Sequence, residues 1–163
     1  MRYIMTTLLI LFLSLPVFAE TGNGKNYGIA VNPSMAMFRV ISGELNIWNL
    51  YRGAEINIPF VLAYKPDLFD NNESSLYILG TKYRHFLSDG QSGFFGEVGY
   101  GFIFGDGNGN TYGNTLLFGI GYRLLYSNGF FWGSSLSMGR VWFVKEEDQI
   151  GFDVDFFKVG YCW

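Results

Sequence analysis

The stretch FFGEVGYGFIF, residues 94–104, alternates bulky apolar side chains with small or polar ones. Val98 and Tyr100 fall on one face, and Glu97 and Gly99 fall on the other. A period of two sustained over ten or more residues predicts a β-strand whose two faces meet different surroundings. One apolar face and one face of glycine and charge are typical of the wall of a membrane β-barrel.

The same pattern recurs along the chain. In residues 114–126, Ile120 lies on the bulky face and Gly121 and Arg123 on the small one, and residues 54–64 alternate likewise. The expected strands are 25–32, 35–49, 54–64, 75–87, 93–104, 114–126, 130–144 and 150–163.

Short and long connections alternate between these strands. The short ones are 50–53, 88–92 and 127–129, and the longer, polar ones are 66–74, 105–113 and 145–149. Single-chain bacterial barrels have an even number of strands, with short turns at the periplasmic side. This topology requires residues 25–32 as a first strand, with Asn32-Pro33-Ser34 as its turn. Alternatively, residues 27–48 form one long strand with a proline bulge.

Two strands have irregular registers. Arg140 shares the outward face of residues 130–144, where its side chain can extend to lipid headgroups. Asp153 and Asp155 share parity with outward Phe157. Either a bulge near Phe156 turns both carboxylates inward, or they lie above the apolar band near the outer loops.

Composition narrows the class of protein. Aromatic residues make up 20% of the chain and glycine 22 of its 163 residues, which suits tilted strands that are bulky on one face only. A secreted β-sandwich would need an apolar inner face, which glycine, serine and charge do not provide. The net charge of −3 argues against a nucleic-acid partner. The single cysteine, Cys162, excludes an internal disulfide.

The amino-terminal segment MRYIMTTLLILFLSLPVFA, residues 1–19, has the parts of a secretory signal peptide: one charge at Arg2, an apolar run and small or branched residues before the cut. The run is too short for a spanning helix of about 20 apolar residues. The expected domains are therefore a signal peptide over 1–19 and a barrel over 20–163. Removing Arg2 with the signal peptide changes the charge from 11 minus 14 to 10 minus 14, or −4.

The last strand, FKVGYCW, carries an assembly pattern. Alternate residues share an apolar or aromatic face, Gly160 lies on the opposite face, and the segment closes on an aromatic. This resembles the carboxy-terminal signature of outer-membrane barrels. The residues of the signature are Phe157, Val159, Gly160, Tyr161 and Trp163.

Three longer segments extend the resemblance: VNPSMAMFRVISGELNIW (31–48), EINIPFVLAY (55–64) and GTKYRHFLSDGQSGFFGEVGYGF (80–102). Together they resemble the small OmpA/OmpX-like proteins of the outer membrane protein β-barrel domain family. The resemblance implies an all-β, eight-stranded, antiparallel, up-and-down transmembrane barrel in the outer membrane of a Gram-negative-type bacterium. It also implies a monomer whose partners are outer-membrane lipid and, through the last strand, the barrel assembly machinery.

Charged residues gather on the inward face. An eight-stranded barrel is only wide enough to be filled by side chains, so we expect these charges to form a paired structural plug. Arg84 and Glu97 should lie close across the hairpin near residue 90. The expected lumen network consists of Glu44, Glu55, Lys82, Arg84, Glu97, Arg123 and Lys158.

Two motifs suggest other chemistry. His85 is the only histidine, and Ser88 follows it at His-x-x-Ser spacing, whereas lipid A deacylases use His-x-Ser to place both groups on one face. On a regular strand His85 and Ser88 point apart, so we expect no catalytic residues. The loop Asp106–Asn110 begins like a calcium loop, but Leu117 stands where the bidentate Glu is needed, and we expect neither metal nor cofactor.

These observations predict a non-enzymatic outer-membrane barrel with a structural or adhesion and interaction role through its surface loops. Two alternatives stay open. A groove that holds His85 with a serine would indicate a lipid A-modifying enzyme, and a continuous water path past Arg84 and Glu97 would indicate a narrow channel.

We predict cleavage between Ala19 and Glu20, because the signal-peptide parts stand in order before this bond. Amino-terminal sequencing of the exported protein should begin at Glu20. An exported chain that begins at Met1 would contradict the prediction.

Overall fold

The computed structural model describes residues 26–51, 53–64, 73–88, 91–107, 112–144 and 147–163. The signal-peptide segment 1–19 lies outside them. The described residues form eight strands and one short 3-10 helix, η1: β1 (Tyr27–Val31), η1 (Pro33–Phe38), β2 (Val40–Tyr51), β3 (Ala54–Tyr64), β4 (Glu73–Phe86), β5 (Gly93–Gly107), β6 (Tyr112–Leu125), β7 (Phe130–Phe143) and β8 (Gln149–Cys162).

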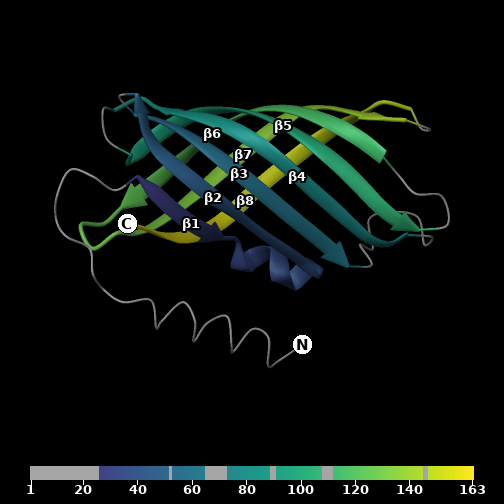
Figure 1. The fold of residues 1–163 in the computed structure, drawn as a ribbon, viewed down its shortest axis with the longest axis horizontal. Helices are drawn as coiled ribbons and strands as arrows, with labels where there is room; N and C mark the ends of the chain where they lie inside the picture. Colours follow the sequence, from purple (N-terminus) through teal and green to yellow (C-terminus); the bar gives the residue numbers. More distant parts are fainter. Residues whose placement is uncertain (1–25, 52, 65–72, 89–90, 108–111, 145–146) are drawn as a thin grey trace.

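The strands close into a barrel. Each strand pairs antiparallel with the next one in sequence, and β1 pairs with β8, so the meander returns to its start (Figure 1). The expected all-β, eight-stranded antiparallel barrel is confirmed, and β1 and β2 are separate strands. Among the described residues, no helix combines the length and apolar character needed to span a bilayer.

Glycine shapes the short connections. Gly53, Gly93 and Gly129 have φ values of 79°, 110° and 95°, and they lie between β2 and β3, at the start of β5 and before β7. These positive values are accessible to glycine at little steric cost. The three connections lie at the barrel end where β1 begins and β8 ends, and we name this the turn end. The strand ends that flank the longer connections lie at the opposite end of the barrel, which we name the loop end. Residues 65–72, 108–111 and 145–146 of these connections lie outside the described residues.

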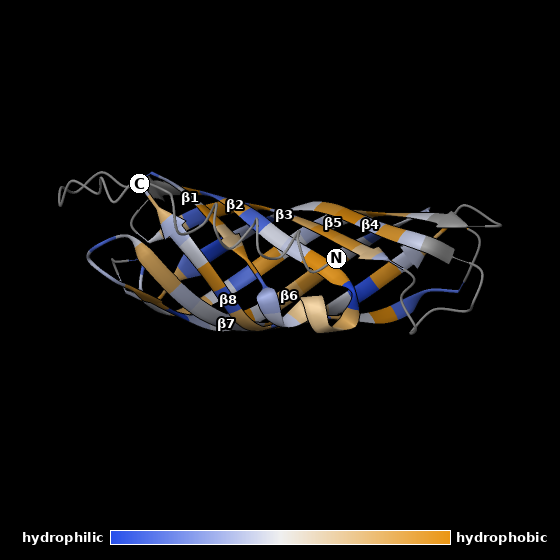
Figure 2. Cartoon of the chain, turned by 90° about the horizontal axis from the view of Figure 1, so that it is seen from below, coloured by the Kyte–Doolittle hydropathy of each residue, from blue (hydrophilic) through white to orange (hydrophobic). Residues whose placement is uncertain are grey.

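The two faces of the wall differ as the alternation predicts. Large apolar side chains such as Tyr100, Phe118 and Ile120 are exposed on the outer face. Charged and polar side chains such as Glu55 and Arg123 are buried inside. Hydrophobic and hydrophilic segments accordingly alternate along the strands in Figure 2.

The expected strand 35–49 is wrong in its first part. Residues 33–38 form η1, and β2 begins only at Val40. Pro33 explains the change, because its fixed φ favours the first turn of a helix and it has no N–H for a strand ladder. Arg39 then takes a left-handed conformation with φ 59°, which ends η1 and redirects the chain into β2.

A bulge turns the aspartates of β8 inward, as one of the two alternatives predicted. Gly133 pairs with Lys158, but Ser135 pairs with Asp155, so Phe156 and Phe157 together lie opposite Ser134. Both phenylalanines are exposed, and Asp155 is buried. The bulge therefore restores the inward face of β8 after two consecutive outward residues.

Aromatic rings lie across glycines of the neighbouring strand. Phe95 is directly opposite Gly121, and Phe131 is opposite Gly160. A Cβ atom on Gly121 would come within 2.3 Å of the Phe95 ring, and one on Gly160 within 2.2 Å of the Phe131 ring. Glycine at these positions lets large rings fit inside a narrow barrel.

We predict that Gly121→Ala lowers the free energy of unfolding by about 1–3 kcal/mol, the usual cost of overpacking. Its Cβ would also meet the Ser134 carbonyl oxygen at 2.6 Å, so moving Phe95 alone cannot relieve the clash. Gly96→Ala in the same hairpin is the matched control, since the nearest atom is 4.0 Å away. Urea titration of the refolded barrel in detergent compares the two variants. Equal stability of both variants would show that ring and glycine are not in contact.

Candidate functional site

The structure brings all seven residues of the lumen network together. Each is at most 7% exposed, and they extend inward from six strands: β2, β3, β4, β5, β6 and β8. Because the barrel is narrow, side chains from facing strands meet at its axis.

Arg84 is the centre of the network. Its guanidinium donates to Glu55 at 2.7 Å, to Glu97 at 2.9 and 3.1 Å and to Glu44 at 3.4 Å. The pair expected across the β4–β5 hairpin is thus present, with two further carboxylates beside it. Arg123 shares Glu55, to which it donates at 2.6 and 3.2 Å.

The lysines connect the network to β8. Lys158 donates to Glu44 at 2.7 Å and also pairs with Asp155. Lys82 lies 3.5 Å from Glu97 and 2.5 Å from Asp153. The described part of the lumen therefore contains five carboxylates and four cations, which gives a net charge of −1. Asp153, whose side chain is 33% exposed, is the least buried of them.

Polar partners that the sequence analysis missed complete the network. Ser137 donates to Glu97 at 2.5 Å, Ser135 to Asp155 at 3.2 Å and Asn46 to Glu44 at 2.9 Å. Asn32 donates to Asp155 at 2.7 Å. Ser135 and Ser137 lie on the inward face of β7, so the alternation along this strand could have predicted them. The contact of Asn32 could not be predicted in this way, because it depends on the turn into η1.

Aromatic rings cover the network toward the turn end. The Arg84 guanidinium lies 4.3 Å from the centre of the Phe95 ring, and that of Arg123 lies 4.4 and 5.0 Å from those of Phe86 and Phe131. These rings come from the ends of β4, β5 and β7 nearest the short turns. Stacking on an aromatic face stabilises a guanidinium that has left water.

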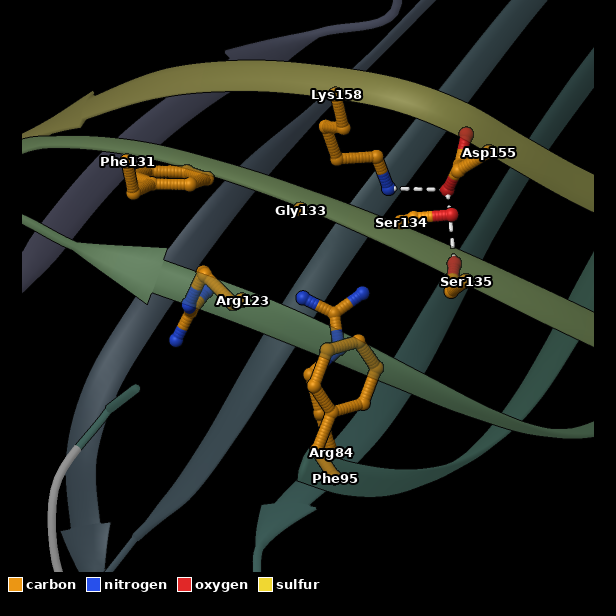
Figure 3. Close-up of a pocket in the computed structure, with 9 residues that line it drawn as sticks. All are labelled: Arg84, Phe95, Arg123, Phe131, Gly133, Ser134, Ser135, Asp155 and Lys158. Atoms are coloured by element: carbon orange, nitrogen blue, oxygen red, sulfur yellow. Dashed lines mark hydrogen bonds and ion pairs between the residues drawn. The ribbon is translucent and has the colours of Figure 1, made fainter. Parts of the chain in front are cut away.

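A small cavity beside the network has room for about one water molecule. Figure 3 shows Arg84 and Lys158 beside it and the bonds that join Asp155 to Lys158 and Ser135. Toward the loop end, an apolar cluster occupies the lumen. Its buried members are Ala63, Leu76, Ile103 and Val141.

His85 and Ser88 have other neighbours. His85 is exposed on the outer face, and its Nδ1 lies 3.4 Å from the Tyr83 hydroxyl. The Ser88 hydroxyl donates to the Ser92 carbonyl at 2.7 Å, and Glu97 lies inside the barrel. The described geometry therefore does not assemble a triad from these residues.

The remaining motifs lie in β8 and around the end of β5. In β8, Phe157 is exposed, Gly160 lies under the Phe131 ring, and the Tyr161 ring lies 5.2 Å from that of Phe130. Val159 pairs with Val31, and Trp163 is exposed. Most of the calcium-like loop falls on 108–111, outside the described residues, and the described part of the chain contains no group of three or more metal-ligating side chains. The Cys162 thiol donates to the Gly129 carbonyl at 3.2 Å.

Comparison with protein-family models, curated proteins and solved structures finds no match to this chain. The resemblance to OmpA/OmpX-like proteins therefore stays a prediction from the sequence, and the structure supports a small eight-stranded barrel.

We predict that Glu97→Ala destabilises the barrel by about 3–5 kcal/mol, because it leaves part of a buried cation uncompensated. In a double-mutant cycle with Arg84→Ala, the coupling should be about 0.5–3 kcal/mol, measured by urea titration in lipid vesicles. The exposed pair Arg140–Asp148, at 2.6 Å with the Arg140 side chain 62% exposed, is the control. Arg140→Ala should cost at most about 1 kcal/mol. Strictly additive effects of Glu97→Ala and Arg84→Ala would contradict the coupling.

Proposed function

We propose that the protein is a monomeric outer-membrane β-barrel of a Gram-negative-type bacterium. Its role is structural, or adhesive and interactive through the longer connections at the loop end. The observation that supports this most is the inside-out distribution of side chains: exposed apolar residues surround a wall whose interior is charged. A water-soluble barrel would not expose so continuous an apolar surface.

Aromatic residues at both ends of the outer face support membrane residence. Tyr27 and Tyr126 are exposed near the turn end, and Tyr64, Tyr77 and Tyr112 are exposed near the loop end. Outer-membrane barrels carry aromatic girdles at the two levels where lipid meets water. This distribution concerns the outer face alone. It therefore supports a bilayer independently of the charged network inside the barrel.

The filled lumen favours a structural role over conduction. The ion-paired network, the rings on its guanidinium groups and the apolar cluster follow one another along the barrel axis. The cavity beside Arg84 has room for about one water molecule. The absence of enzyme activity is part of the proposal, and it rests on the separate surroundings of His85 and Ser88.

Fractionation followed by a heat-modifiability gel tests the proposal. We expect the protein in the outer-membrane fraction, with a change in gel migration after boiling, because the folded barrel stays compact in detergent until it is heated. Recovery in the soluble fraction would overturn membrane residence. A membrane-bound chain whose migration does not change on boiling would contradict the closed barrel.

We predict that Ile120→Arg lowers stability in lipid vesicles by about 2–4 kcal/mol, the cost of arginine at the midplane of a barrel. Ile120 is 72% exposed and lies well inside β6. Ile150→Arg is the matched control, since Ile150 is exposed but second in β8, near the rim at the loop end, where the cost should be about 0–1 kcal/mol. Urea titration in vesicles measures both variants. Equal costs at the two positions would contradict the assigned membrane depth.

A further inference from the structure

The barrel closes through a short ladder. β1 pairs with β8 only over residues 28–31 and 159–162, whereas β6 pairs with β7 over residues 113–125 and 131–143. This is the shortest of the eight described ladders. Toward the loop end, the chain turns from β1 into η1 instead of continuing along β8 (Figure 1). Few backbone bonds therefore hold the boundary between the first and last strands.

Two side-chain links cross this boundary on the inner face of the wall. Asn32, which follows β1, donates to Asp155 on β8 at 2.7 Å. Lys158 on β8 donates to Glu44 on β2 at 2.7 Å, so it reaches past β1, whose inward residue beside Glu44 is the small, buried Ala30. We name the four polar residues Asn32, Glu44, Asp155 and Lys158 the clasp. Each of them is at most 7% exposed.

Each charged residue of the clasp has a second partner on its own side of the boundary. Lys158 also pairs with Asp155 within β8, and Asp155 accepts a hydrogen bond from Ser135 on β7 at 3.2 Å. Glu44 also pairs with Arg84 on β4 at 3.4 Å. Parting β8 from β1 breaks both clasp links, yet it leaves none of these charges without an opposite charge.

The rest of the lumen network is compatible with an opening at this boundary. Lys82 and Asp153 join β4 to β8 across the lumen, but Lys82 keeps Glu97 at 3.5 Å, and Asp153 is already 33% exposed. Parting β4 from β5, in contrast, would take both Lys82 and Arg84 away from Glu97. An uncompensated buried charge is costly. Charge pairing therefore favours an opening between β1 and β8 over one between β4 and β5.

β1 is held more firmly to β2 than to β8. The ladder between β1 and β2 covers residues 27–31 and 43–47, and the N–H of Asn32 extends it by donating to the Ser42 carbonyl at 2.9 Å. η1 also connects the two strands directly in the chain. When the wall parts, β1 and η1 therefore move with β2, and β8 stays with β7.

We propose that the wall opens and recloses locally between β1 and β8, and that the clasp controls this opening. The opened state exposes the backbone groups of one short ladder and keeps the lumen charges paired. Such an opening needs less free energy than the parting of a long ladder or global unfolding. The proposal concerns the barrel itself and goes beyond its proposed role in the outer membrane.

The alternation of backbone groups identifies the amides that report the opening. Trp163 and Tyr27 exchange N–H bonds across the boundary, whereas the N–H of Cys162 points to Gly129 before β7. Because successive residues of a strand direct their N–H groups to opposite edges, the N–H groups of residues 29, 31, 159 and 161 point across the boundary. Those of residues 28 and 30 point to β2.

Amide hydrogen exchange of the unsubstituted, refolded barrel in detergent tests the proposal. We expect the amides of residues 29, 31, 159 and 161 to exchange at least about tenfold faster than those of the β6–β7 ladder, because they need only the local opening. The amides of residues 28 and 30 should stay slower than these four. Equal exchange in both ladders would overturn the local opening. Equal exchange at 28–31 would overturn the movement of β1 with β2.

Asn32→Ala tests the role of the clasp. A hydrogen bond to a charged group is lost, so exchange at residues 29, 31, 159 and 161 should rise about tenfold. Ser137→Ala is the matched control, since it removes a hydrogen bond to the buried carboxylate of Glu97 between β7 and β5. It should leave these four amides unchanged. No change with Asn32→Ala, or an equal rise with Ser137→Ala, would overturn control by the clasp.

A disulfide across the boundary gives a test in the opposite direction. Gly28 is directly opposite Cys162, next to the bonded pair of Tyr27 and Trp163, and such a neighbouring pair has its Cα atoms about 4.5 Å apart. This spacing suits a disulfide. Oxidised Gly28→Cys should exchange the amides of residues 29 and 161 at least about tenfold more slowly than the same variant after reduction. Equal exchange in the cross-linked and reduced forms would overturn an opening at this boundary.

Discussion

The compensation of charge inside a narrow closed wall is the constraint on which the rest of the structure depends. Eight strands leave an interior that only side chains can fill. Ionised groups in such a space are tolerated only when they are paired and hydrogen-bonded. Arg84 meets this requirement through three carboxylates, and each of these carboxylates has a second cation: Arg123, Lys82 or Lys158.

The packing around the network follows from the same lack of space. Rings that stack on Arg84 and Arg123 need room, and glycines on the adjacent strands provide it, as Gly121 does for Phe95 and Gly160 for Phe131. The high glycine and aromatic contents of the chain are thus two aspects of one arrangement. A large side chain on one strand lies opposite a glycine on the next strand.

Much of the fold could be predicted from the sequence because one physical signal, the period of two, extends over nearly every strand. Parity alone placed Glu97 inside and Ile120 outside. Parity fails where the backbone leaves the regular extended form. The helical turn at Pro33 and the bulge at Phe156 depend on local backbone conformation and on pairing with a distant strand. The contact between Asn32 and Asp155, 123 residues apart, depends on both of these irregularities and had no signal in the sequence.

The sequence separation within the lumen network has a consequence for the order of assembly. Glu44 on β2 receives Lys158 from β8, 114 residues later, so this pair forms only after the wall has closed. In the proposed membrane location, an open sheet that entered the bilayer earlier would carry Glu44 and Lys158 into lipid before they have paired. Closure of the wall and transfer into the membrane would then be coupled steps, and the late synthesis of β8 would make it the element that completes both.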